Sequence, residues 1–238
     1  MATFLVAHGA WSAGWAWKKM RPLLRDRGHE LITPTYTGLG ERAHLARPEV
    51  DLETHIADVL GVLQCEDLRD VILVGHSYGG MVATGVADRV PERLAQLVYL
   101  DAFVPRSGQA LVDLTPQAPG GGPATPEVEA WRIPANPVPP DTSATDLAWI
   151  MPRRFPQPRK TFEQALKMSG ASDRITTTYI YCTRPRPGDV FGQFAERARR
   201  EPGWRYLEID ATHNPHITAP DALAGLLDGV ASRGGGSA

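Results

Sequence analysis

The chain has 238 residues, 42% of them hydrophobic and 22% charged, and its formal net charge is −2. This length suits one α/β domain with a sizeable core, and the charge gives no electrostatic attraction to nucleic acid or to an anionic membrane. No apolar run is long enough to span a membrane and the N-terminus shows no secretory signal, so we expect a cytoplasmic protein. The two cysteines, Cys65 and Cys182, are expected to be buried apolar residues rather than a disulfide.

Strand-like and helix-like segments alternate along the chain. The pattern predicts strands at 4–7, 30–33, 71–74, 97–100, 178–182 and 205–209. It predicts helices at 15–27, 52–65, 81–87, 190–200 and 220–230. This alternation is typical of a mostly parallel sheet with helices on both faces, which is the α/β class.

The segment 105–172 interrupts the alternation. It is rich in proline and glycine at 115–140, and helix-like pieces follow at 145–151 and 161–168. Its apolar side chains would anchor it against the core and argue against a disordered linker; they are Trp131, Trp149, Ile150, Phe155, Phe162 and Met168. We therefore expect a first core part (1–104), a lid or cap insertion (105–172), a second core part (173–232) and a flexible tail (233–238).

The strand at 71–74 runs directly into Gly75-His76-Ser77-Tyr78-Gly79, and a helix-like pattern follows at once. This is the Gly-x-Ser-x-Gly pattern of a nucleophile elbow, in which a sharp strand-to-helix turn lifts a serine hydroxyl out at the end of a sheet. The glycines avoid side-chain clashes across the turn, and the positive end of the new helix lies below the serine. Ser77 is therefore the candidate nucleophile.

A neutral serine needs a base and a group that orients the base. In folds with this elbow the chain order is serine, acid, histidine, and His213 follows the last predicted strand. His216 is the competitor, with a lid-facing or surface position as its simpler interpretation. The acid is Asp101 or, as the alternative, Asp189, with Asp210 a third candidate. The earlier histidines are expected to be surface or loop residues: His29, His44 and His55.

Two backbone N–H groups should form an oxyanion hole. Tyr78 follows the nucleophile, and Ala10 lies in the loop after the first strand, so these two residues are the candidates. Four aromatic side chains are candidates for substrate binding: Trp11, Phe103, Trp131 and Trp149. The Gly38-Leu39-Gly40 run lacks the third glycine of a dinucleotide loop and is expected to be a loop turn.

Several motifs together resemble one branch of the α/β-hydrolases. They are His8-Gly9-Ala10-Trp11, Gly14-Trp15-Ala16-Trp17, Thr37-Gly38-Leu39-Gly40-Glu41-Arg42, Gly75 to Gly80, Leu100 to Pro105, and His213. The branch holds plant methylesterases, hydroxynitrile lyases and bacterial carboxylesterases of the pyrethroid-hydrolase type. The resemblance implies a serine hydrolase without metal or cofactor that cleaves carboxylic esters of small to medium apolar molecules. We expect a small-molecule ester substrate and no nucleic-acid or membrane partner, and the sequence leaves the oligomeric state, monomer or homodimer, open.

Other functions remain open on the sequence. The hydroxynitrile lyases that the chain resembles carry threonine where Gly9 stands and use a lysine in the lid, where this chain has Lys160 and Lys167. A hydrolase that tailors lactones or polyketides would share the esterase mechanism. Hormone receptors built on this fold show that a non-catalytic ligand-binding protein is also compatible with it.

Overall fold

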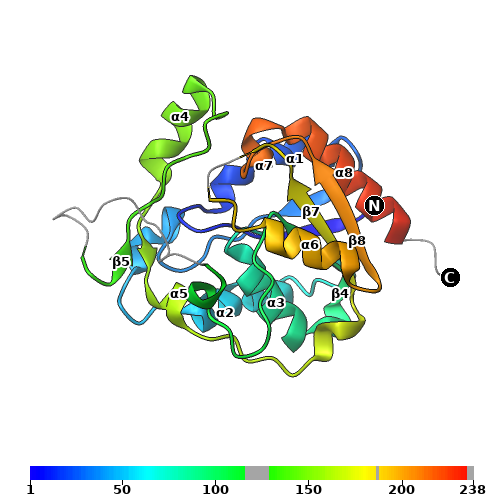
Figure 1. Cartoon of the computed structure of the whole chain (residues 1–238), viewed down its shortest axis with the longest axis horizontal. Helices are drawn as coiled ribbons and strands as arrows, with labels where there is room; N and C mark the ends of the chain where they lie inside the picture. The colour runs from blue at the N-terminus through cyan, green and yellow to red at the C-terminus, as the bar shows by residue number, and fades with distance from the viewer. Residues whose placement is uncertain (116–128, 186–187, 235–238) are drawn as a thin grey trace.

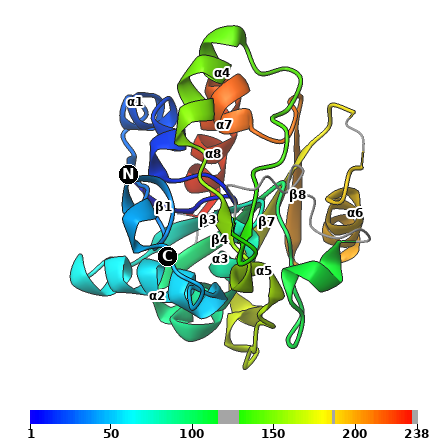
Figure 2. The ribbon, with the colours of Figure 1, turned by 90° about the vertical axis from the view of Figure 1, so that its left-hand side faces the viewer.

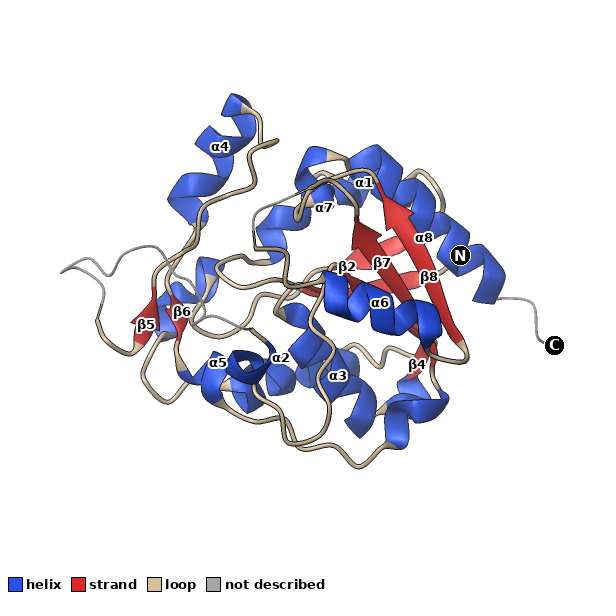
Figure 3. Cartoon of the chain, in the orientation of Figure 1, coloured by secondary structure: helices blue, strands red, loops and turns tan. Residues whose placement is uncertain are grey.

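The computed structural model describes residues 1–115, 129–185 and 188–234, and its centre is a six-stranded parallel sheet (Figures 1 and 3). The strand order is β2-β1-β3-β4-β7-β8. The strands are β1 (Thr3–Ala7), β2 (Glu30–Ile32), β3 (Val71–His76), β4 (Leu94–Leu100), β7 (Thr176–Cys182) and β8 (Trp204–Ile209). The expected α/β class is confirmed. The predicted tail at 233–238 lies outside the described residues from 235 onward, and the last helix reaches Gly234.

Helices cover both faces of the sheet, so every residue of β3 is buried. One face packs against α1 (Met20–Arg25), α7 (Pro215–Thr218) and α8 (Pro220–Gly234). The other packs against α2 (Leu52–Cys65), α3 (Gly79–Arg89) and α6 (Gly192–Arg200). Figures 1 and 3 show α1, α7 and α8 gathered on one side of the strands. Within the described ranges, no helix is both long and apolar enough to cross a bilayer.

Residues 105–172, hereafter the insertion, connect β4 to β7. They hold the antiparallel pair β5 (Arg132–Ile133) and β6 (Gln157–Pro158), the helices α4 (Ala144–Ile150) and α5 (Lys160–Glu163), and the short 3-10 turns Leu111–Leu114 and Met151–Arg153; a further 3-10 turn, Ala171–Arg174, crosses the end of the insertion. Figure 2 shows α4 on the same side of the molecule as α7. Lys19 joins these two helices, because its Nζ pairs with Asp146 (2.6 Å) and donates to the carbonyl of Ile217 (3.0 Å).

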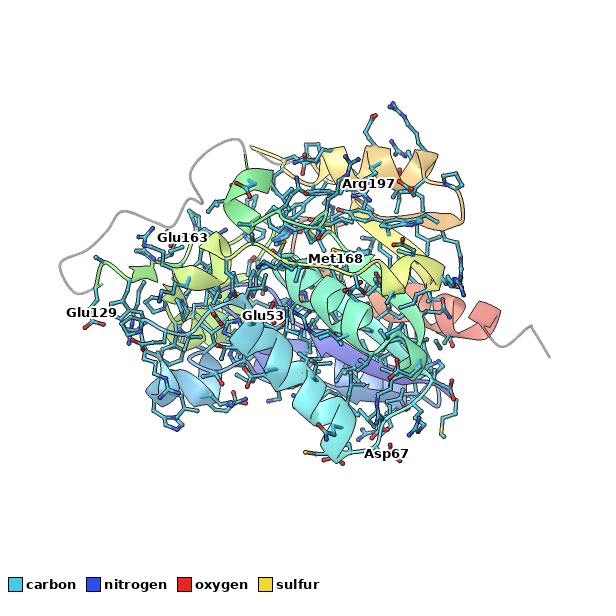
Figure 4. All side chains as sticks on the ribbon, turned by 90° about the horizontal axis from the view of Figure 1, so that it is seen from below. Glu53, Asp67, Glu129, Glu163, Met168 and Arg197 are labelled. Atoms are coloured by element: carbon cyan, nitrogen blue, oxygen red, sulfur yellow. The ribbon has the colours of Figure 1, made fainter. Side chains whose placement is uncertain are left out.

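The insertion returns to the core across α3. Figure 4 labels Met168 at this crossing, and Met168 packs against the core cluster on that face of the sheet. The next three amides, of Ser169, Gly170 and Ala171, all donate to the carboxylate of Asp88 on α3, at 2.6 to 3.0 Å. These bonds lower the pKa of Asp88 although its burial alone would raise it. One carboxylate therefore fixes the end of the insertion.

Two predicted helices are shorter than expected. Instead of one helix over 15–27 there is a 3-10 turn, η1 (Gly14–Trp17), and then α1, which begins two residues before Pro22. Proline has no N–H and is tolerated in the first turn of a helix, so it sets where α1 can start. The helix predicted over 161–168 ends at Glu163. Gln164 leaves the helix and its side chain bonds Glu53 N (2.8 Å) at the start of α2.

The two cysteines differ in burial, and one residue expected to anchor the insertion is exposed. Cys182 is buried, but Cys65 is exposed, because it ends α2 on the face away from the apolar residues Leu52, Ile56, Val59 and Leu63. Phe155 was expected to anchor the insertion and is 38% exposed. The two cysteines are free, as expected.

The turn from β3 into α3 brings backbone segments into direct contact. A Cβ on Gly79 would stand 1.9 Å from the carbonyl oxygen of Ala7, and one on Gly80 would stand 2.1 Å from the carbonyl oxygen of Phe103. Because the obstructing atoms belong to the backbone, no side-chain rotation relieves the clash. Glycine at both positions is therefore a condition for this turn, and the turn places residue 77 at the end of the sheet.

Gly80→Ala should destabilise the fold by about 3 kcal/mol, since the new methyl group overpacks a backbone contact. The matched control is Gly61→Ala on α2, where a Cβ would meet no atom within 4 Å and better helix propensity should add up to about 1 kcal/mol. Urea unfolding of the three proteins measures both effects. Equal stability of the two variants would contradict the proposed contact.

Candidate active site

Ser77 stands at the tip of the turn in a strained backbone conformation. Its φ is +56°, in the left-handed region, which costs a non-glycine residue roughly 1–3 kcal/mol. Three backbone hydrogen bonds hold it there: its N–H donates to Leu100 O (3.3 Å), and its carbonyl accepts from Gly80 (3.0 Å) and Phe103 (3.1 Å). The carboxyl end of β4 therefore fixes the position of the serine.

Ser77, His213 and Asp101 form one hydrogen-bonded chain. Nε2 of His213 lies 2.9 Å from Oγ of Ser77, and Nδ1 of His213 lies 2.6 Å from Oδ2 of Asp101. Because an ionised carboxylate only accepts hydrogen bonds, the proton of a neutral His213 sits on Nδ1 and Nε2 is free to accept from the serine hydroxyl. Asp101 is fully buried, has a φ of +43° and also accepts from the N–H of Cys182 (3.3 Å).

The loop that carries His213 is held from three sides. Nε2 of His76 donates to the carbonyl oxygen of His213 (2.8 Å). The ring of Phe191 stacks on the imidazole, with centroids 4.7 Å apart. The preceding residue, Thr212, donates through Oγ1 to Asp141 of the insertion. The insertion thus helps to orient the imidazole.

The other two acid candidates are used elsewhere. Asp189 accepts the N–H of Phe191 (2.9 Å) and so supports the loop whose ring stacks on His213. Asp210 is exposed and pairs with Arg184 (3.0 Å). Both ring nitrogens of His213 are engaged by other groups, so the structure brings Asp101 to the histidine and neither of its two rivals.

Two backbone N–H groups near Ser77 are available to bind an oxyanion. In the described part of the chain no hydrogen bond engages the N–H of Ala10 or of Tyr78, and Tyr78 precedes the first residue of α3, where the helix dipole is positive. The next amide, of Trp11, is engaged, because it donates to Oε1 of Gln157 (3.1 Å). Gln157 is a fully buried residue of β6 that the sequence did not single out.

A buried histidine holds the side chain of Tyr78. Nε2 of His55 faces the carbonyl of Thr37 (3.0 Å), which can only accept, so Nδ1 accepts from the hydroxyl of Tyr78 (2.9 Å). The expectation that His55 is a surface or loop residue is wrong, since it is fully buried in α2. Its place on the apolar side of that helix, beside Leu52 and Ile56, was the signal that could have found it.

His216 is also misplaced by the sequence. It is not a surface residue, since it is 2% exposed and stacks on Trp17 with centroids 4.7 Å apart. The reason is that Pro215 starts α7, which packs its first turn against η1. His44 is exposed as expected.

A cavity of about 840 Å³ opens over Ser77. It is bordered by His213, by both candidate oxyanion residues, and by Trp11 and Phe103 among the predicted substrate-binding residues. Trp131 and Trp149 do not border it: the guanidinium of Arg132 covers the first ring at 4.3 Å, and the second packs edge-on against Trp15 at 5.4 Å. Among the described residues, no group of histidine, cysteine and acidic side chains could hold a metal ion.

Comparison with known proteins identifies the family of this chain. The model of the alpha/beta hydrolase family matches residues 4–226, and the chain belongs to that family. It is 40% identical to the carbendazim hydrolyzing esterase of Nocardioides sp. (strain SG-4G), over 95% of this chain and 98% of that protein. It is 32% identical to the alpha-hydroxynitrile lyase of Arabidopsis thaliana, over 50% of this chain and 47% of that one.

Among solved structures, an extracellular alpha/beta-hydrolase from a Paenibacillus species superposes with a TM-score of 0.77 at 25% identity, over 95% of this chain and 98% of that one. That hydrolase is described as sharing structural and functional homology with tobacco salicylic acid binding protein 2. The expected resemblance to this branch of hydrolases is therefore confirmed.

Four buried histidines make the fold sensitive to acid. Burial lowers the pKa of His8, His55 and His216 to about 3 and holds that of His76 well below its ordinary value. In the unfolded chain each has a pKa of about 6.5, so between these values the unfolded state binds more protons than the folded state. Their contribution to stability is therefore complete above about pH 6.5 and is lost as the pH falls toward 3.

Below pH 6, each buried histidine should lower the folding equilibrium constant by up to tenfold per pH unit. Urea unfolding at several pH values between 7.5 and 5 gives the slope of the unfolding free energy against pH. At the acid end of this range, we expect unfolding to take up about three to four protons. His44→Gln, at an exposed site, should leave the slope unchanged. A slope near zero would mean that these rings are not buried and neutral.

Proposed function

We propose that this protein hydrolyses carboxylic esters of small to medium apolar molecules through an acyl-enzyme on Ser77. The observation that carries the proposal is the unbroken hydrogen-bonded chain from Asp101 through His213 to the Ser77 hydroxyl, at the floor of a largely apolar cavity. Kinship with an esterase over nearly the whole length of both proteins supports the reaction class.

In the proposed mechanism, His213 takes the proton of Ser77 as the hydroxyl attacks the ester carbonyl. The amides of Ala10 and Tyr78 stabilise the oxyanion, a contribution worth about 2.7–4 kcal/mol per donor. The protonated His213, stabilised by the carboxylate of Asp101, then gives its proton to the leaving alcohol. A water molecule attacks the acyl-enzyme by the same route and releases the acid.

Residues 105–172 act, in this proposal, as a lid over two core parts, 1–104 and 173–232. The lid role is supported by the walls of the cavity, because residues of the insertion line it together with residues of the core. The insertion contributes Leu111, Ile150 and Phe162, among others. The Gln157 and Asp141 bonds to the core tie the lid to the catalytic loops. The lid would then set which esters fit.

Ester hydrolysis fits the site better than cyanohydrin cleavage. Gly9 stands in a tight place for a threonine, because a Cβ there would stand 3.0 Å from His76 Nδ1 and 3.2 Å from Ser77 Cβ. Lys160 and Lys167 are both exposed, and no lysine is among the described residues that border the cavity.

Wild-type protein should hydrolyse short p-nitrophenyl esters, and Ser77→Ala should reduce kcat by about 10⁶, as loss of the serine does in subtilisin. A fluorophosphonate probe should label the wild type and not the variant. The Nocardioides relative is named as a carbendazim hydrolyzing esterase, so carbendazim is the next compound to test. Unlabelled wild type without esterase activity would favour the ligand-binding alternative instead.

Asp101→Asn should lower kcat by about 10⁴, because the amide favours the wrong tautomer of the catalytic histidine, as the equivalent substitution does in trypsin. The matched control is Asp189→Asn, which changes the acid that supports Phe191 and should cost far less. Both substitutions are isosteric, so the ratio of the two kcat values isolates the role of the carboxylate. A collapse of kcat in Asp189→Asn alone would assign the acid to that residue.

A further inference from the structure

The loop after β1 carries backbone strain at Trp11, the residue that follows Ala10. Its φ is +54°, in the left-handed region that a side chain disfavours, and such a conformation persists only where its surroundings hold it. The insertion supplies two of the bonds that do so. The N–H of Trp11 donates to Oε1 of Gln157 on β6 (3.1 Å), and the indole Nε1 donates to the carbonyl of Ile133 on β5 (2.9 Å). Both strands of the small sheet therefore hold the loop that carries a candidate oxyanion donor.

Gln157 makes this contact as part of a chain of buried hydrogen bonds. Its Nε2 donates to Oγ1 of Thr161 (2.8 Å), and Oγ1 donates its own proton to the carbonyl of Pro158 (2.6 Å). The side chains of Gln157 and Thr161 are both fully buried. Because the N–H of Trp11 can only donate and the carbonyl of Pro158 can only accept, the direction of every bond in the chain is determined. A buried polar chain that is satisfied in this way favours one arrangement of the side chains.

The N–H of Ala10 lies between two peptide groups that are each held by a side chain. The carbonyl of Gly9, which shares a peptide plane with this N–H, accepts from Nδ1 of His8 (2.8 Å). The next peptide group, between Ala10 and Trp11, is held by Gln157. Because each peptide group is planar, only the two torsions of Ala10 join them. Holding both groups therefore sets the direction of the Ala10 N–H, and one of the two holds comes from the insertion.

The same segment of the insertion reaches Tyr78, the other candidate oxyanion donor. The ring centroid of Phe162 lies 5.5 Å from that of Tyr78 and 5.7 Å from that of Trp11. Burial raises the pKa of Tyr78, and the nearby hydroxyl of Thr161 opposes this rise. Neither Gln157 nor Thr161 is among the described residues that border the cavity. These two side chains would therefore act on the site through the residues that they hold and not by touching the substrate.

We propose that Gln157 is a positioning residue of the oxyanion hole, which aims the N–H of Ala10 through the peptide group of Trp11, with Thr161 as its support. This inference rests on the proposed function and deepens it, because it gives the insertion a part in stabilising the transition state. A donor that is already aimed stabilises an oxyanion without reorganising during the reaction. Loss of Gln157 should therefore lower kcat and kcat/KM together and leave KM nearly unchanged.

The first test replaces Gln157 by methionine, a side chain of similar length that cannot accept the N–H of Trp11. For p-nitrophenyl acetate, kcat of Gln157→Met should fall about ten- to hundredfold, less than the 10²–10³ that outright loss of a donor costs. The matched control is Gln164→Met, the same change at another glutamine of the insertion. Gln164 bonds Glu53 N (2.8 Å) and Asp51 Oδ2 (3.0 Å) at the start of α2, so its loss should leave kcat and KM unchanged.

A thiono analogue of the same ester, in which sulfur replaces the carbonyl oxygen, separates a misplaced donor from a disturbed fold. Sulfur accepts hydrogen bonds weakly, so the thiono ester gains little from an oxyanion hole. In Gln157→Met, kcat/KM should fall about tenfold more for the oxygen ester than for the thiono ester. Thr161→Val keeps the shape of the side chain and removes its hydroxyl, and it should shift the same ratio about two- to fivefold. The double variant should be little worse than Gln157→Met, because the two side chains act as one unit.

Equal losses of kcat/KM for the two esters in Gln157→Met would overturn the inference and leave Gln157 with a purely structural role. An unchanged kcat in this variant would do the same. If Gln157→Met does not fold, the ratio measured in Thr161→Val decides, and an unshifted ratio there overturns the inference. Wild type that hydrolyses neither ester and is not labelled by fluorophosphonate would refute the proposed function and this inference together. An active wild type whose variants keep the ratio would refute the inference alone.

Discussion

The whole site depends on one contact, the close approach of the start of α3 to the backbone of two neighbouring segments. Gly79 lies against the carbonyl of Ala7, and Gly80 lies against the carbonyl of Phe103. Because nothing larger than hydrogen fits there, the helix can begin directly over the ends of β1 and β4. That position brings the loop with Ala10, the strained Ser77 and the end of β4 within reach of a single reacting atom.

Strain at this junction is shared between two residues on adjacent strands. Both Ser77 and Asp101 have a positive φ although neither is glycine. The N–H of Ser77 is bonded to the carbonyl just before Asp101, and the N–H of Asp101 is bonded to Ile180 on β7. The sheet thus holds the two conformations in place with hydrogen bonds that a parallel ladder supplies at its carboxyl edge. The free energy that offsets the strain of these two residues comes from the buried strands and not from the site itself.

Local patterns in the sequence predicted those features of the structure that are determined by residues close together in the chain. The six strands, the elbow and the bounds of α2 follow from apolar runs, glycine spacing and helical periodicity, and Ser77, Asp101 and His213 were already candidates at their strand ends. The choice between Asp101 and Asp189 was not predictable, because it depends on how the loop after β7 folds. The partnership of Gln157 with Trp11 joins residues 146 positions apart, and no local signal reports it. The same holds for Trp131 and Trp149, whose rings pack against Arg132 and Trp15.

The insertion is bonded to both loops that surround the nucleophile. Gln157 receives the amide of Trp11, next to the oxyanion loop, and Asp141 receives the hydroxyl of Thr212, next to the histidine. In evolutionary terms, the segment that shapes the pocket and the segments that carry the chemistry are not independent modules. A lineage that exchanged this insertion for another could change its range of substrates only by inheriting equivalents of these two side chains. Divergence in this branch would then proceed more readily by point substitution within the insertion than by its replacement.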